Sequence, residues 1–69
     1  MKLETRILRL LGRNPEGLST YEISKRLRIS WSTASLHCYK LLSSDRIIRK
    51  RVSRFGRHKD IWIKNGSEQ

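Results

Sequence analysis

The sequence predicts a small α+β domain, mostly helical, in which three helices precede a C-terminal β-hairpin. Two patterns predict this order. Apolar residues recur at helical spacing as far as Leu42, and helix start signals stand at Ser19 and Ser30. From Ile47 onward, two runs rich in β-branched and aromatic residues flank a polar stretch that contains Gly56. The helical period therefore gives way to a strand period once along the chain.

The first predicted helix is amphipathic and begins near the N-terminus. Its apolar stripe follows the i, i+4, i+7, i+8 spacing of one helix face and comprises Leu3, Ile7, Leu10 and Leu11. We expect Gly12 to end this helix in the left-handed conformation, because residues 14–17 (Asn-Pro-Glu-Gly) cannot continue it.

The second predicted helix begins at a capping box. In the run from Ser19 to Glu22, the serine hydroxyl should accept a backbone N–H bond and the glutamate should reach back to the serine backbone. The helix should end near Leu27, since the next residues break its pattern. Ile29 is expected to point into the core from the following turn.

The third predicted helix spans residues 30–43, with Ser30 as its N-cap. Its core side carries Ala34, Cys38, Leu41 and Leu42, and His37 lies at the rim of that side. Its outer side carries Ser32, Leu36, Tyr39, Lys40 and Ser43, flanked by Thr33 and Ser35. This outer side has no acidic residue, which favours a helix that faces phosphates over one that is merely solvated. Small hydroxyls and one apolar side chain suit contacts with base edges and thymine methyl groups.

The hairpin is predicted to pair residues 47–53 with residues 60–65, joined by a loop of residues 54–59. Trp62 lies off the face that Ile61 and Ile63 share, so it either contacts nucleic acid or packs within the wing or a dimer. His58 could add positive charge at the tip when it is protonated. Seven basic residues and no acid fall between positions 46 and 59: Arg46, Arg49, Lys50, Arg51, Arg54, Arg57 and Lys59. Charge of one sign is expected of a hairpin that follows a phosphate backbone or enters a minor groove.

Composition restricts the function classes. The formal net charge of +10 favours a polyanionic partner. The single cysteine excludes an internal disulfide, and no apolar run reaches the roughly 20 residues that span a bilayer. The carboxylates form no recognisable pair, and the chain has neither a phosphate-binding glycine loop nor metal-ligand spacing, so we expect no enzyme and no cofactor. Residues 1–65 should form one domain and residues 66–69 a frayed tail; a cytoplasmic, nucleoid-associated location is expected.

A resemblance to a known superfamily covers residues 3–65. It is carried by Leu18-Ser19, Glu22-Ile23-Ser24, Leu27, Ile29-Ser30, Ser32-Thr33-Ala34-Ser35, Leu41-Leu42, Ile47-Ile48 and Arg51. This pattern resembles the winged helix-turn-helix superfamily, and it is similar to small bacterial and archaeal repressors of the arsenic-repressor and multiple-antibiotic-resistance-repressor types. The resemblance implies that the helix of residues 30–43 enters the DNA major groove and that residues 54–59 form the wing. Metal-sensing members use clustered cysteines, whereas Cys38 stands alone.

Three alternatives remain beside duplex DNA binding. Tyr39 and Trp62 match in position a tyrosine and a tryptophan of winged helices that bind left-handed Z-form duplexes, although Ser35 replaces that family's asparagine and its paired wing prolines are absent. A winged helix can also be a protein-interaction adaptor. RNA stays open because phosphate attraction does not distinguish it from DNA.

The sequence thus predicts a regulator that binds double-stranded DNA, with no small-molecule ligand and no membrane association. A monomer and a homodimer are both compatible with the sequence. The residues expected to contact DNA are Trp31, Ser32, Thr33, Ser35, Leu36, Tyr39, Lys40, Arg49, Arg51, Arg54, Arg57, His58, Lys59 and Trp62.

Overall fold

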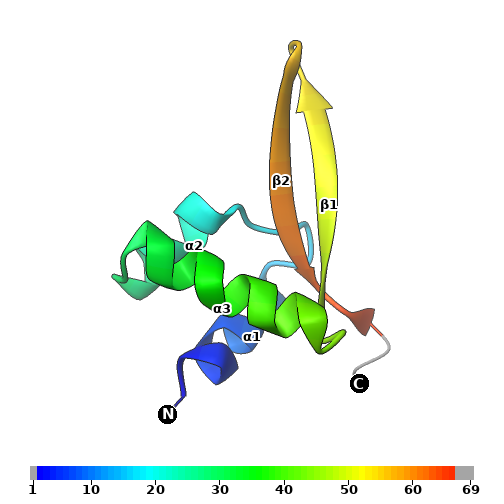
Figure 1. The fold of residues 1–69 in the computed structure, drawn as a ribbon. Helices are drawn as coiled ribbons and strands as arrows, with labels where there is room; N and C mark the ends of the chain where they lie inside the picture. Colours follow the sequence, from blue (N-terminus) through cyan, green and yellow to red (C-terminus); the bar gives the residue numbers. More distant parts are fainter. Residues whose placement is uncertain (1, 67–69) are drawn as a thin grey trace.

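A computed structural model describes residues 2–66 of the chain. Its elements in order are α1 (Leu3–Arg13), α2 (Thr20–Leu27), α3 (Trp31–Ser43), β1 (Ile47–Arg54) and β2 (Arg57–Lys64). The predicted α+β fold is confirmed, in the layout of a winged helix: the helices gather into one body, and the antiparallel hairpin extends from it (Figure 1). The predicted frayed tail lies outside the described residues, apart from Gly66.

The core forms where the helices meet the base of the hairpin. Its buried hydrophobic residues are Ile7, Leu11, Leu18, Ile23, Ala34, Cys38, Leu41, Ile47 and Trp62. Ile29 packs against this cluster from the turn before α3, as expected. Burial raises the pKa of the Cys38 thiol to about 12, so the side chain behaves as a small neutral apolar group.

Two helix ends differ in detail. The expected stop at Gly12 is wrong, because α1 continues to Arg13 and closes at Asn14, whose side-chain amide donates to the Leu10 carbonyl at 2.8 Å. Left-handed residues instead follow α2, where Arg28 has a φ of 57°, and α3, where Asp45 has a φ of 59°. A side chain that binds the last turn replaces the glycine stop in α1.

Gly17 brings the loop before α2 against β2. Its φ is 94°, and a Cβ atom there would lie 2.9 Å from Ile61 Cδ1 and 3.2 Å from the Trp62 carbonyl oxygen. The next residue, Leu18, forms an antiparallel bridge with Trp62: the Leu18 N–H donates at 3.1 Å, and the Trp62 N–H donates back at 2.8 Å. Strand β2 is therefore held on one edge by β1 and on the other by Leu18.

The hairpin is longer and its connection shorter than the sequence predicts. The strands pair from Ile47 with Lys64 to Arg54 with Arg57. The loop of residues 54–59 is wrong: only Phe55 and Gly56 connect the strands, with φ angles of 54° and 75°. Two successive positive φ angles are typical of the tight turn that matches the twist of paired strands. The polar run that looks like a loop is strand. It lacks an apolar alternation because both faces of this part of the hairpin meet solvent.

The two faces of the hairpin are also reversed relative to the apolar pattern. Trp62 is only 2 % exposed and shares the core with Ile47, whereas Ile61 and Ile63 are half-buried on the opposite face. The Trp62 indole Nε1–H donates to Thr20 Oγ1 at 2.8 Å, which satisfies its one polar atom. The open question about Trp62 is thus resolved in favour of structural packing.

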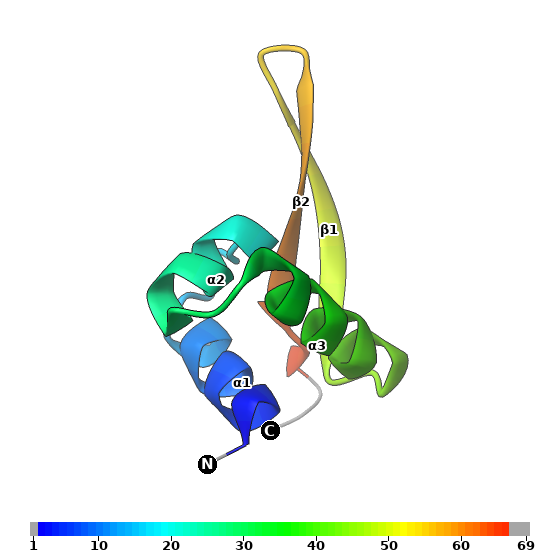
Figure 2. The ribbon, with the colours of Figure 1, turned by 60° about the vertical axis from the view of Figure 1, so that its left-hand side comes forward.

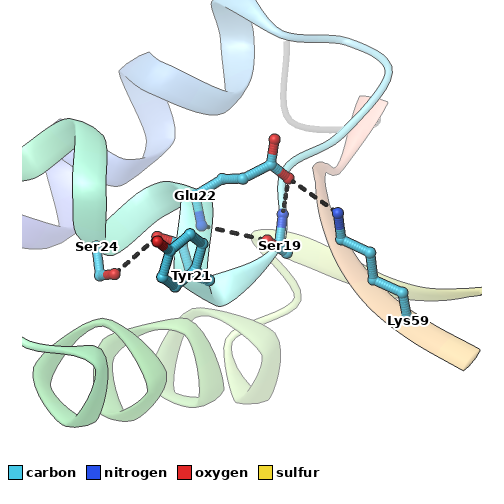
Figure 3. Close-up of polar contacts among 5 residues, drawn as sticks. All are labelled: Ser19, Tyr21, Glu22, Ser24 and Lys59. Carbon is cyan, nitrogen blue, oxygen red and sulfur yellow. Dashed lines mark hydrogen bonds and ion pairs between the residues drawn. The ribbon is translucent and has the colours of Figure 1, made fainter.

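The capping box of α2 is confirmed. The Glu22 N–H donates to Ser19 Oγ at 3.2 Å, and the Ser19 N–H donates to Glu22 Oε1 at 3.0 Å (Figure 3). Lys59 Nζ lies 3.5 Å from the same carboxylate oxygen, so β2 also reaches this cap. The backbone hydrogen bond from Ser19 holds the pKa of Glu22 below its ordinary value.

A second polar contact joins α1 to α3. His37 Nδ1 lies 3.0 Å from Glu4 Oε2, and this hydrogen bond lowers the pKa of the Glu4 carboxyl. The histidine at the rim of the core is therefore a satisfied structural residue, as the sequence predicts.

Replacing Ser19 tests the cap. Ser19→Ala should lower the free energy of unfolding by about 1 kcal/mol, because one N–H at the start of α2 loses its acceptor. Ser32→Ala, at an exposed site on α3, should change it by less than about 0.5 kcal/mol. Urea unfolding measures both, and equal losses in the two variants would contradict the assigned cap.

The Glu22 carboxylate should make part of the stability depend on pH. Its pKa is lower in the folded chain than the ordinary 4.5, so its contribution is present above about pH 4.5 and is lost as the pH falls through the folded value. The stability difference between the wild type and Glu22→Gln should therefore shrink on acidification. Thermal melts of both proteins between neutral pH and pH 3 measure it, and a constant difference would exclude the linkage.

Two glycines separate backbone strain from steric clash. Gly56→Ala meets nothing within 4 Å but keeps a positive φ, so it should cost about 1 kcal/mol. Gly17→Ala has the same strain together with the clash against β2, and should cost about 2–3 kcal/mol. Chemical denaturation of the two variants measures their losses of stability. Equal losses would contradict close packing of Gly17 against β2.

Candidate nucleic-acid interface

The outward side of α3 is free of the core along the whole helix. Trp31 is 59 % exposed, Leu36 55 % and Tyr39 47 %, and Ser32 and Lys40 are also exposed. The core side of the same helix packs against the other helices and β1, which fixes how these side chains point outward. The predicted division of α3 into a buried and an outer face is confirmed.

The first turn of α3 is held by a polar cap. Ser30 Oγ accepts the Thr33 N–H at 3.1 Å and donates to Thr33 Oγ1 at 2.8 Å. Thr33 is half-buried, and its hydroxyl is engaged in this cap, so it acts mainly as part of the helix start. Ser35, one turn after Trp31, is half-buried and faces the hairpin side.

Most of the predicted basic residues of the hairpin are exposed. Arg49, Arg51, Arg57, His58 and Lys59 all present their side chains to solvent. The strand register places Arg49 and Arg51 on the face of Trp62, next to α3, and Lys59 on the other face beside Val52. Arg54 is a predicted contact whose side chain lies outside the described part of the structure.

One contact joins the base of the hairpin to the outer side of α3. Arg49 Nη1 donates to the Tyr39 hydroxyl at 3.3 Å. The Tyr39 ring packs against Trp62 edge to face, with ring centroids 5.4 Å apart and planes at 84°. In both views α3 runs beside the base of the hairpin (Figure 2). Outer α3 and the basic strand therefore form a continuous surface, which we call the α3–wing face.

Trp62 must be removed from the predicted contacts. With 2 % of its surface exposed it offers almost nothing to a partner. Its effect is indirect, because it supports the ring of Tyr39 from below and holds Thr20 through its indole N–H. The sequence misleads here because a tryptophan between two isoleucines looks like the exposed member of the strand.

Acidic side chains are almost absent from the α3–wing face. Residues 30–44 contain none, and within the hairpin the single acid is Asp60. Arg51 Nε donates to Asp60 Oδ1 at 3.2 Å, but the arginine side chain remains 68 % exposed. An ion pair so open to water is weak, so the guanidinium stays available for a phosphate.

Tyr21 is an exposed residue of this region that the sequence reasoning passed over. It lies in the first turn of α2, is 60 % exposed, and has Lys25 Nζ 5.4 Å from its ring centroid. The signal was present, because the capping box starts a helix whose first turn is open to solvent. An aromatic residue there has no core to pack against.

Within residues 2–66, no three His, Cys, Asp or Glu side chains gather where they could hold a metal ion. None of the helices that the structure describes has the length and apolar character needed to cross a bilayer.

Comparisons with known proteins give no assignment. A scan against protein-family models, a search of curated proteins and a search of solved structures each return no match.

Proposed function

We propose that this chain is a winged-helix protein that binds duplex DNA through the α3–wing face and regulates transcription. One observation carries the proposal: Arg49 joins a basic strand to an acid-free helix face by its bond to Tyr39. A merely solvated surface mixes charges of both signs, whereas a surface for a polyanion does not. The net charge of +10 supports the same partner.

Two groups of residues have different roles in this proposal. The guanidinium and ammonium groups of the hairpin neutralise phosphates and set the register of the protein on the duplex. The exposed Ser32, Leu36 and Lys40 enter the major groove, where hydroxyl, apolar and amine groups distinguish base edges. Affinity then comes mainly from the wing, and sequence preference from α3.

The Tyr39–Trp62 pair favours a second candidate, binding of left-handed Z-form duplexes. The resemblance to Z-form binders implies that these two rings pack together, and here they pack edge to face. Circular dichroism of an alternating C–G duplex distinguishes the candidates. Inversion of its spectrum on adding protein supports the Z-form; an unchanged spectrum with binding supports the right-handed duplex.

Salt titration tests the phosphate contacts. If about six to eight phosphates are neutralised, log K should fall with log salt with a slope of roughly −5 to −7. Fluorescence anisotropy with a labelled random-sequence duplex of about 30 base pairs, a length of roughly three helical turns, measures it. Absence of binding at low salt would overturn the proposal and turn attention to an acidic protein partner.

Matched variants divide the two roles. Arg51→Ala, on the hairpin face next to α3, should weaken binding to all sequences alike and reduce the salt slope by about 1. Leu36→Ala should reduce the discrimination between preferred and random sites more than the overall affinity. Arg9→Ala removes an exposed charge from α1, outside the α3–wing face, and should change the slope by less. Equal effects of Arg9→Ala and Arg51→Ala would exclude a specific role of the wing.

A further inference from the structure

A hollow of about 340 Å³ opens between the first turn of α2, the start of α3 and β2. Its volume falls at the lower end of the range for pockets that hold small ligands. Tyr21, Trp31 and Tyr39 contribute to its lining, one from α2 and two from α3. The buried Trp62 contributes from β2. The hollow therefore adjoins the α3–wing face and is built by three separate elements.

Exposed aromatic rings are concentrated at this hollow. Among the described residues, the aromatic side chains with large exposure are Tyr21, Trp31, Tyr39 and Phe55, and the first three line the hollow. The indole N–H of Trp62 is already satisfied by Thr20. Flat rings held open to water in one place form a surface on which another flat ring can stack.

The polar groups of the hollow are suited to a base edge and unsuited to a phosphate. Asp60, the single acid of the hairpin, lines it together with the half-buried Ser35. A carboxylate repels a phosphate but accepts hydrogen bonds from an exocyclic amine such as cytosine N4. Arg51 Nε already donates to Asp60 Oδ1 at 3.2 Å, and a carboxylate has acceptor positions beyond that one bond for a ligand that carries N–H donors.

Two lysines lie near the hollow, one of them in its lining. Lys59 contributes to its lining and is paired with Glu22 at 3.5 Å. Lys25 stands over the Tyr21 ring, with Nζ 5.4 Å from the centroid. These ammonium groups add positive charge near the phosphates of a nucleotide whose base is inside.

We propose that this hollow binds one unpaired base of a nucleic acid held on the α3–wing face. The base stacks on the aromatic rings, and its amine-bearing edge faces Asp60. A base within an intact duplex is covered above and below by its neighbours, so only an extruded, bulged or single-stranded nucleotide can enter. This inference rests on the proposed nucleic-acid binding and adds a preference for distorted sites.

Three duplexes of identical flanking sequence test the proposal with the full chain. The first duplex is fully paired. The second has a single unpaired cytosine at its centre, and the third has an unpaired abasic nucleotide at the same place. The cytosine bulge should bind about tenfold more tightly than the other two. Equal affinity for the cytosine and abasic bulges would overturn the base site, because the abasic duplex bends without offering a base.

The same experiment separates this proposal from the proposed function. Tight, salt-dependent binding of the paired duplex without any bulge preference overturns the base site and leaves the function standing. If the protein binds none of the three duplexes, both the base site and the proposed function are overturned.

Variants locate the preference. Tyr21→Leu keeps an apolar side chain but removes a stacking surface; it should bring the cytosine-to-abasic affinity ratio close to one and leave the paired duplex within about twofold. Phe55→Leu is the matched control, since Phe55 is 95 % exposed at the hairpin turn and does not line the hollow. Its ratio should equal that of the wild type. Circular dichroism confirms that each variant is folded, and a ratio retained by Tyr21→Leu would place the base elsewhere.

Asp60→Ala tests the recognition of the base edge. The wild type should prefer an unpaired cytosine to an unpaired thymine, which has no exocyclic amine. Asp60→Ala should remove that preference while general affinity rises, because a negative charge has left the basic surface. Persistence of the cytosine preference in this variant would exclude the carboxylate as its acceptor.

Discussion

The two backbone hydrogen bonds between Leu18 and Trp62 are the constraint on which the other features depend. They attach the loop before α2 to the middle of the molecule and hold Trp62 at the junction of helices and hairpin. From there the indole N–H fixes Thr20 and the ring edge supports Tyr39. The position of the hairpin relative to α3 is thus determined by buried contacts, whereas its exposed charges add little rigidity.

A chain this small depends strongly on such a junction. Domains of this size bury a limited core, so each fully buried ring matters more than it would in a larger protein. Gly17 is required at the junction because any larger residue would meet β2 there. The polar cap of Ser19 and Glu22 follows directly after it, and Lys59 reaches that cap from the strand. The loop, the helix start and the hairpin therefore stabilise one another.

The parts of the fold that local physics determines were predictable from the sequence. The stripes of α1 and α3 and the caps at Ser19 and Ser30 depend on residues a few positions apart, and the structure has them where the pattern indicates. The extent of the hairpin was not predictable, because residues 57–59 are polar on both faces and carry no alternation. The turn at Phe55 was not predictable either, since a bulky residue rarely takes a positive φ.

The candidate site was predictable where exposure follows from helix periodicity, as for Leu36 and Lys40. It was not predictable where two distant segments meet. The burial of Trp62 depends on Leu18, more than 40 positions away in sequence, and the contact of Arg49 with Tyr39 joins a strand to a helix. The hollow with Tyr21 needs three elements at once. Periodicity describes one element at a time and cannot supply these contacts.

The two-residue turn reduces the conformational freedom of the basic segment. A loop of six residues would present its cations in many arrangements and would lose that freedom on binding. A paired strand instead holds alternate side chains about 6.6–6.8 Å apart on each face, a repeat close to the axial rise of two base pairs, roughly 6.8 Å. The side chains of Arg49 and Arg51, alternate residues of β1, therefore start from backbone positions at this fixed spacing. For the proposed contacts with phosphates, the backbone entropy of this segment is therefore lost when the chain folds and not when the partner binds.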